Sequence, residues 1–167
     1  MGWSNLLRKN FLPLAMMQVY GDEYFMRLAL QEAQKAADAG EVPIGAVIAS
    51  GDKLLARCHN STEMLSDVTA HAEILAITAA SQYLGSKYLV DCTLYVSLEP
   101  CVMCAGALRW SQISRVVFAT ADDKAGFMRY GKELLHPRTV LEMGIMMDES
   151  ALLLKSFFMQ RRKPKSE

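Results

Sequence analysis

Several signatures of specialised protein classes are missing from this 167-residue chain. Neither sign of charge is in excess, since 18 Lys and Arg balance 18 Asp and Glu. This excludes a surface that is positive all over, although a local basic patch could still bind nucleic acid. No apolar run approaches the length of a membrane span, and four cysteines are too few for a disulfide framework. We therefore expect a cytoplasmic globular protein with no membrane partner.

The first 21 residues precede the folded domain that the pattern predicts. Two basic residues stand before an apolar stretch at 11–17, as in a signal peptide, but Pro13 interrupts that stretch. We expect residues 1–21 to be a poorly ordered extension, or the product of an upstream start codon. Residues 22–162 are then one domain, and 163–167 form a basic tail.

Helical and strand patterns alternate through this domain. Apolar residues near a 3.6-residue period predict a helix from Asp22 to Gly40, and two apolar segments around Ser50–Asp52 predict a hairpin. The expected elements after it are a helix behind the cap-like Ser66 and Asp67 that ends near Gly85, a strand at 92–98, a helix at 101–111, a strand at 114–120, a loop, a strand at 140–146 and a helix at 147–163. This order predicts a three-layer α/β/α sandwich with a mixed central sheet.

Cys101 and Cys104 stand three residues apart at the start of a predicted helix. Their sulfurs then share one face, and the helix N-terminus favours the thiolate forms. Alone, such a pair fits a redox disulfide, half of a structural Cys₄ zinc site or two ligands of a catalytic metal site. The other cysteines, Cys58 and Cys92, lie apart in predicted strands, where a buried thiol is the simpler interpretation.

His71 and Glu73 open another predicted helix upstream of the cysteine pair. By itself, a glutamate in a first turn usually compensates the helix dipole. With Cys101 and Cys104 behind a proline, however, the two complete the His-x-Glu…Pro-Cys-x-x-Cys signature of zinc nucleobase deaminases. One imidazole and two thiolates give zinc three ligands and leave a fourth position for water, whose pKa the metal lowers to roughly 7. We therefore predict a catalytic zinc site, with Glu73 as proton shuttle.

The segments around these residues resemble the cytidine/deoxycytidylate deaminase superfamily and, within it, the bacterial tRNA adenosine deaminases. The likeness runs from about Tyr24 to Arg162, and its most specific segments are VPIGAVI, DVTAHAEI, LYVSLEPCVMCAGAL and RVVFATADDKAG. The resemblance implies a cytidine deaminase-like fold and a zinc-dependent deaminase domain at 22–162. It also implies hydrolytic conversion of the wobble adenosine of a tRNA anticodon to inosine, one Zn²⁺ per subunit and a homodimer. The implied RNA partner is the anticodon stem-loop.

The resemblance also implies roles for single residues. His71, Cys101 and Cys104 match the zinc ligands, and Glu73 matches the proton shuttle. Further matches are Asn60 as a hydrogen-bond partner of the base, Pro43 and Ile44 as the floor beneath it, Asp122 and Lys124 as a loop beside the sugar and backbone, and Phe158 and Arg162 as the helix end beside the anticodon. Simpler interpretations are a turn for Asn60, a solvated loop for Asp122, and a basic helix end that only satisfies its dipole.

Departures from the family pattern leave alternatives open. The segment from Phe127 to Val140 is shorter than in many relatives and lacks an Asn-His pair, and Val68 stands where a proline is usual. The shorter segment leaves the substrate-side loop contacts open. The enzymatic alternative is a deaminase of a free base or nucleoside, of guanine or cytidine type. The alternative from another class is a zinc-stabilised binding module without turnover, against which Glu73 argues, because a structural site has no use for it.

An RNA substrate requires an open mouth with basic residues around it. The candidates for this rim are Arg109, Lys124, Arg129, Lys132, Arg138 and the segment Arg161–Lys165. Because the net charge is zero, we expect few phosphate contacts and a shallow salt dependence of binding. Trp110 and the Met-rich segments fit either a dimer interface or the core.

Overall fold

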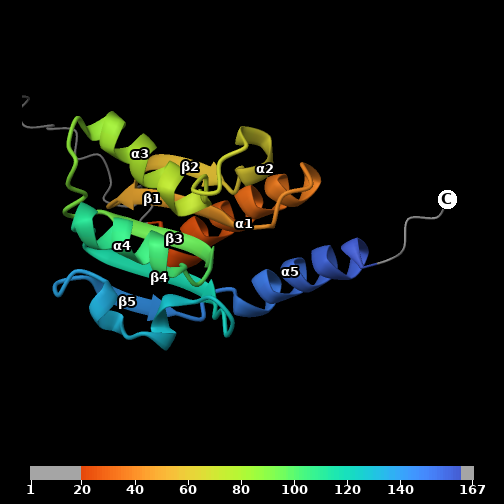
Figure 1. The fold of residues 1–167 in the computed structure, drawn as a ribbon. Helices are drawn as coiled ribbons and strands as arrows, with labels where there is room; N and C mark the ends of the chain where they lie inside the picture. The colour runs from red at the N-terminus through yellow and green to blue at the C-terminus, as the bar shows by residue number, and fades with distance from the viewer. Residues whose placement is uncertain (1–19, 163–167) are drawn as a thin grey trace, which may run out of the picture.

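A computed structural model describes residues 20–162 (Figure 1). Its elements are α1 (Asp22–Asp38), β1 (Gly45–Ser50), β2 (Lys53–His59), α2 (Thr62–Leu65), α3 (Ala72–Leu84), β3 (Thr93–Leu98), α4 (Val102–Ser111), β4 (Arg115–Thr120), the 3₁₀ turns η2 (Phe127–Arg129) and η3 (Lys132–Leu134), β5 (Val140–Met143) and α5 (Met147–Arg161). The expected extension lies outside the described residues except for its last two, and so does the tail at 163–167. No helix within 20–162 is both long and apolar enough to cross a membrane.

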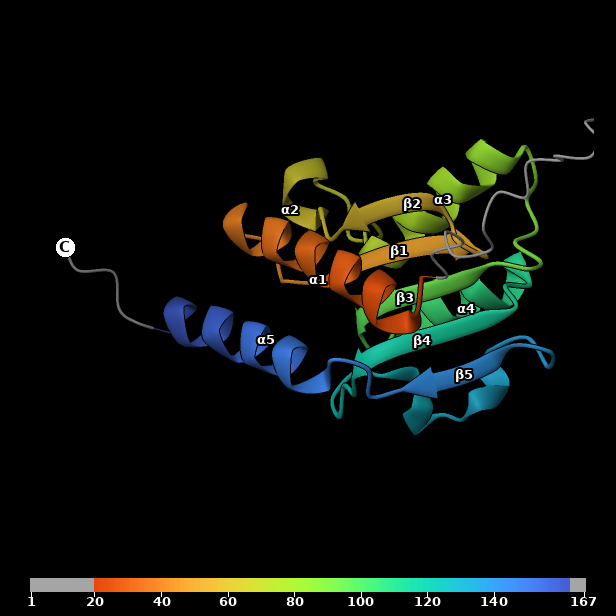
Figure 2. The same cartoon turned by 180° about the vertical axis from the view of Figure 1, so that it is seen from behind.

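Five strands form one mixed sheet in the order β2-β1-β3-β4-β5. β1 is antiparallel to β2 and to β3, whereas β3, β4 and β5 run parallel. α1 and α5 lie on one side of the sheet, and α3 and α4 cover the other (Figures 1 and 2). The predicted three-layer α/β/α sandwich with a mixed sheet is therefore confirmed.

The central strands are apolar on both faces because both faces are covered. In β3, Leu94 and Val96 belong to the core that α3 and α4 close, whereas Tyr95 packs with α1. All three side chains are buried. β4 repeats the alternation, as expected when successive side chains of a strand point to opposite faces. The short apolar runs at 92–98 and 114–120 thus contain β3 and β4, two inner strands of the sheet.

The hairpin is also confirmed, and its first strand starts where α1 touches the sheet. The turn includes Gly51, whose φ of 55° lies in the left-handed region that favours glycine. At Gly45 a Cβ atom would lie 2.0 Å from the carbonyl oxygen of Ala29 and 2.4 Å from the nitrogen of Ala33. Only a glycine lets the α1 backbone approach β1 this closely, and this contact fixes where the α1–β1 loop runs.

The helix expected behind Ser66 and Asp67 begins later than predicted. Ser66 is the left-handed C-cap of the short helix α2, which was not expected. Oδ1 of Asp67 accepts hydrogen bonds from the backbone N–H and the hydroxyl of Thr69, at 2.8 and 2.7 Å. Asp67 therefore closes a turn, and α3 starts at Ala72 with His71 as its N-cap.

Arg115 on β4 forms hydrogen bonds with residues of α1 and of β5. Its guanidinium donates to both carboxylate oxygens of Asp22, at 2.7 and 2.6 Å, and also to Glu142 on β5. The hydroxyl of Tyr95 donates to the same aspartate at 2.7 Å. The hydrogen bonds from Arg115 hold the pKa of the Asp22 carboxyl below its usual range. One side chain thus ties the first helix to the last strand.

Candidate metal centre and active site

Two helices on the same side of the sheet bring their N-termini to one place. His71 is the N-cap of α3, Cys101 is the N-cap of α4, and Cys104 lies in the first turn of α4. α3 and α4 lie next to each other against the sheet (Figure 1). A helix N-terminus has a partial positive charge that stabilises thiolates. The position of both cysteines at the N-terminus of α4 therefore favours cation binding by their sulfur atoms.

The three donor atoms have the spacing of a zinc site. Nδ1 of His71 lies 3.7 Å from Sγ of Cys101 and 3.6 Å from Sγ of Cys104, and all three atoms lie within 4.8 Å of one another. Zinc binds sulfur at about 2.3 Å and nitrogen at about 2.0–2.1 Å. At a tetrahedral angle these bond lengths place nitrogen and sulfur about 3.6 Å apart. The two distances from His71 therefore fit one zinc ion bound to all three residues.

The two cysteines shift each other's pKa in opposite directions. A hydrogen bond from Cys104 lowers the pKa of the Cys101 thiol to about 4, and His71 acts in the same direction. The same shared bond, together with burial, raises the pKa of Cys104. The Cys101 thiol, with its lowered pKa, is therefore the more readily deprotonated of the two.

Glu73 lies buried beside this cluster with one oxygen unused. Its side chain is 3% exposed, and within the described part of the chain Oε2 has no hydrogen-bond partner. Burial raises the pKa of the Glu73 carboxyl to about 7. A buried polar atom without a partner requires an explanation, and a water molecule held at the adjacent cluster would satisfy it. Glu73 does not belong to the group of three donor atoms, so this oxygen is open to a hydrogen bond from such a water.

Backbone hydrogen bonds bring the predicted base-binding residues next to the cluster. The N–H of Asn60 donates to the carbonyl oxygen of Ile44 at 2.9 Å, and the N–H of Ser61 donates to that of Ala70 at 3.0 Å. Ala70 directly precedes His71. Asn60 is itself buried. The residues predicted from separate segments therefore meet at one end of the sheet.

A carboxylate that sequence reasoning missed holds this region together. Glu41 is buried and accepts a hydrogen bond from Nδ2 of Asn60 at 3.1 Å. It also accepts the N–H groups of Glu63 and Met64 in α2, at 3.0 and 2.8 Å. Pro43, two residues later, is buried as well. The only signal in the sequence was an acidic residue next to the segment VPIG.

Asp122 and Lys124 lie on a loop that contacts a predicted metal ligand. A β-bridge pairs Gly126 of this loop with Cys101. Oδ1 of Asp122 accepts the N–H groups of Lys124 and Ala125, at 3.0 and 3.1 Å, and so shapes the loop from within. The side chain of Lys124 is exposed. The loop is therefore beside the cluster, with its lysine free to meet a ligand.

Phe158 and Arg162 lie farther along the molecule, at the end of α5. This helix extends away from the sheet (Figures 1 and 2). Phe158 is exposed, and Arg162 donates to its carbonyl oxygen. A hydrogen bond from Arg161 to the carbonyl oxygen of Gly40 joins this helix end to another part of the described chain. This contact places the end of α5 near the α1–β1 loop.

Two of the predicted basic rim residues stabilise loops instead. Nη1 of Arg109 donates to two backbone carbonyl oxygens around η3, at 2.7 Å each. Nη1 of Arg129 donates to the carbonyl oxygens of Asp123 and Lys124, at 2.9 and 2.8 Å. Guanidinium groups engaged in this way are less available to phosphates. Among the rim candidates within the described residues, the side chains of Lys124 and Lys132 are less constrained by hydrogen bonds than those of these two arginines.

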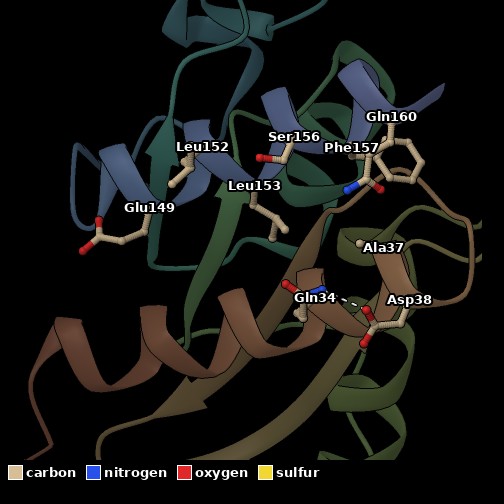
Figure 3. Close-up of a pocket in the computed structure, with 9 residues that line it drawn as sticks. All are labelled: Gln34, Ala37, Asp38, Glu149, Leu152, Leu153, Ser156, Phe157 and Gln160. Atoms are coloured by element: carbon tan, nitrogen blue, oxygen red, sulfur yellow. Dashed lines mark hydrogen bonds between the residues drawn. The ribbon is translucent and has the colours of Figure 1, made fainter. Parts of the chain in front are cut away.

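A hollow of about 510 Å³ lies between α1 and α5 (Figure 3). None of its lining residues belongs to the metal cluster. Its walls include the apolar Leu153 and Phe157 together with Gln34, and its charged residues, Asp38 and Glu149, are both acidic. It lies on the α1 side of the sheet, opposite the helices that hold the cluster (Figures 1 and 2). An acidic lining does not suit phosphates, so the cluster is the better candidate for chemistry on RNA.

Comparison with known proteins places the chain in a family. Residues 20–120 match the family model of the cytidine and deoxycytidylate deaminase zinc-binding region. A tRNA-specific adenosine deaminase of Aquifex aeolicus (strain VF5) is 44% identical over 147 residues, which cover 85% of this chain and 97% of that protein.

Solved structures agree with this assignment. One from a study of A-to-I editing by tRNA:A34 deaminases at the wobble position of transfer RNA has a TM-score of 0.74 and 40% identity, covering 78% of this chain and 99% of the other. A guanine deaminase from Nitrosomonas europaea has a TM-score of 0.73 and 26% identity, covering 83% and 85%. The chain therefore belongs to the zinc-binding cytidine and deoxycytidylate deaminase family and, within it, to the tRNA-specific adenosine deaminases.

Proposed function

We propose that this chain hydrolyses the wobble adenosine of a tRNA anticodon to inosine, with one Zn²⁺ held by His71, Cys101 and Cys104. The main support is the donor set: one imidazole nitrogen 3.6–3.7 Å from two sulfurs, beside the unpartnered Oε2 of Glu73. A structural zinc site takes four protein ligands, whereas a catalytic site takes three and keeps one position open. The tRNA substrate is supported by the relatives, which are tRNA-specific adenosine deaminases.

Glu73 performs the proton transfers in this proposal. When bound, zinc supplies the Lewis acidity that makes water nucleophilic at neutral pH. Oε2 of Glu73 accepts a proton from the water that attacks C6 of the adenine and delivers it to N1 of the ring. The carboxyl group then assists departure of the 6-amino group as ammonia. One water is consumed and one ammonia is released, which leaves the carbonyl of inosine.

Residues on both sides of the cluster hold the nucleotide. Asn60 hydrogen-bonds the base, and Pro43 and Ile44 form the surface against which the base packs. Asp122, Lys124, Phe158 and Arg162 contact the sugar, the backbone and the flanking nucleotides. The target base has to leave the stack of the anticodon loop to reach this site, which is easier in a loop than in a duplex.

We propose a second copy of this chain as a partner at α4. Val102, Gly106 and Trp110 follow one another at a four-residue spacing and so lie on one side of α4, where Val102 and Trp110 are exposed. Trp110 is 81% exposed, so it does not belong to the core of this chain. A tryptophan this exposed, near the C-terminal end of the helix that holds Cys104, favours an interface on α4.

Light scattering tests this homodimer. We expect a mass near twice the 18.6 kDa of the chain, and a shift to the monomer mass when Trp110→Glu places a charge in the interface. Leu152→Glu is the matched control, because Leu152 is also apolar and 65% exposed but lies on α5. The control should remain dimeric. A monomer mass for the unmodified chain would reject the homodimer.

The cytoplasm is the proposed location. All four cysteines are free, and the two thiols of the cluster have to stay reduced to bind zinc. A reducing compartment provides this condition, and it is also where the substrate tRNA is used.

The substrate class is tested with RNA and free compounds side by side. The protein is incubated with an arginine-tRNA anticodon stem-loop bearing wobble adenosine and, separately, with guanine, cytidine and adenosine, while inosine and ammonia are measured. We expect turnover of the stem-loop and little turnover of the free compounds, because only the stem-loop reaches the outer contacts. Turnover restricted to the free compounds would reject the tRNA substrate. Bound zinc without any turnover would favour a binding module.

A further inference from the structure

A second buried glutamate near the metal cluster has no part in the proton transfers. Glu99 follows β3, two residues before Cys101, and is 6% exposed. Its two oxygens accept backbone hydrogen bonds: Oε2 from the N–H of Asp122 at 3.0 Å and Oε1 from the N–H of Met128 at 2.9 Å. Both donors belong to the loop at 121–128. One carboxylate therefore holds this loop at its two ends.

A glycine allows the loop to fit around the carboxylate. A Cβ atom on Gly126 would lie 2.3 Å from Cδ and Oε1 of Glu99, and 2.6 Å from the carbonyl oxygen of Asp122. The φ of −64° and ψ of 145° at Gly126 are open to any residue. The glycine is thus required by space rather than by backbone conformation, which shows how closely the loop and the carboxylate are packed.

The loop is also bonded to the residues that follow Glu99. The N–H of Phe127 donates to the carbonyl oxygen of Pro100 at 3.0 Å, and Gly126 forms the bridge to Cys101. The position of the loop is therefore set relative to a metal ligand. Any group presented by the loop is held at a fixed place beside the cluster.

We propose that Glu99 is a positioning residue, which holds the 121–128 loop where Asp122 and Lys124 meet the RNA. The proposal rests on the proposed function, because it takes the substrate contacts of this loop from there. A carboxylate suits the task because it can accept at both oxygens, whereas a glutamine would turn an N–H donor toward one backbone N–H. A loop ordered in advance spares the complex the cost of ordering it on binding. Glu99 therefore acts on substrate binding rather than on chemistry.

Glu99→Gln tests the proposal through three measurements. We expect one zinc per chain to remain, and amide exchange at Asp122 and Met128 to become about tenfold or more faster. Because a buried donor loses its acceptor, KM for the stem-loop should rise by about 10- to 100-fold while kcat changes little. Gly126→Ala disturbs the same contact from the loop side, so it should raise KM in the same way if the first variant does not fold.

Glu41→Gln is the matched control for amide exchange alone, since Glu41 is also buried and also accepts two backbone N–H groups, but from α2. Its KM is not compared, because Glu41 also accepts a hydrogen bond from Asn60. It should speed exchange in α2 and leave the 121–128 loop protected. Unchanged loop exchange in Glu99→Gln would show that Glu99 does not hold the loop. Faster exchange with an unchanged KM would show that the held loop does not position substrate. If the unmodified protein forms no inosine, the proposed function fails, while amide exchange still decides whether Glu99 holds the loop.

Discussion

Glu73→Gln should abolish most turnover while the zinc stays bound. We expect kcat for inosine formation in the stem-loop to fall by about 10²–10⁴-fold, the usual contribution of a general acid–base group. Glutamine has nearly the same shape, but its amide cannot accept the proton of the attacking water or deliver it to the ring. The measurements are inosine formation over time and zinc content per chain.

The matched control is Glu149→Gln. Glu149 also lies in the first turn of a helix, α5, but it is exposed. Glu149→Gln removes a negative charge that compensates the dipole of α5, as Glu73→Gln does for α3. It should leave kcat within about twofold, because most substitutions of exposed residues have small effects. Wild-type kcat in Glu73→Gln would mean that another group transfers the proton. Loss of zinc in that variant would instead give the carboxylate a role in metal binding.

Cys104→Ala should remove both the metal and the activity. The side chain of Cys104 supplies one of three donor atoms, and two remaining donors do not make a catalytic zinc site. Even the outer partners of zinc ligands are worth about 10–100-fold in metal affinity or activity, so loss of a ligand should exceed this range. We expect zinc content near zero after dialysis and no detectable inosine.

Cys92→Ala separates this effect from the loss of a buried thiol. Cys92 is also buried, at 1% exposed, and packs in the core between the sheet and α3 and α4. Burial raises the pKa of its thiol, and Cys92 is not part of the group of possible metal donors in the described residues. This variant should keep full zinc content. Equal zinc loss in both variants would remove Cys104 from the proposed ligand set.

The sequence predicts the sheet better than the segments between the strands. β3 and β4 are short apolar runs, and their burial on both faces follows from that pattern alone. The start of α3 was wrong because Asp67 bonds to Thr69 two residues later and closes a turn. Such local side-chain hydrogen bonds compete with helix formation, and residue type alone does not predict which of the two structures forms.

The same distinction applies to the site. His71, Glu73, Cys101 and Cys104 stand at short spacings at two helix starts, so the sequence was enough to group them. Glu41 and Glu99 were missed although both are buried. Their partners are mainly backbone N–H groups of distant segments, and nearly every residue has such a group. No spacing of side chains can therefore identify a carboxylate that holds a loop by its backbone.

The contact between Asp22 and Arg115 has a consequence for how this protein is made. The two residues are 93 positions apart, so the first helix leaves the ribosome long before its partner does. At about 5–20 residues per second, that interval lasts roughly 5–20 s. During this time Asp22 has no guanidinium to bind, and α1 covers only part of its final sheet. The first helix therefore gains this ion pair only after β1, β2 and β3 have been synthesised.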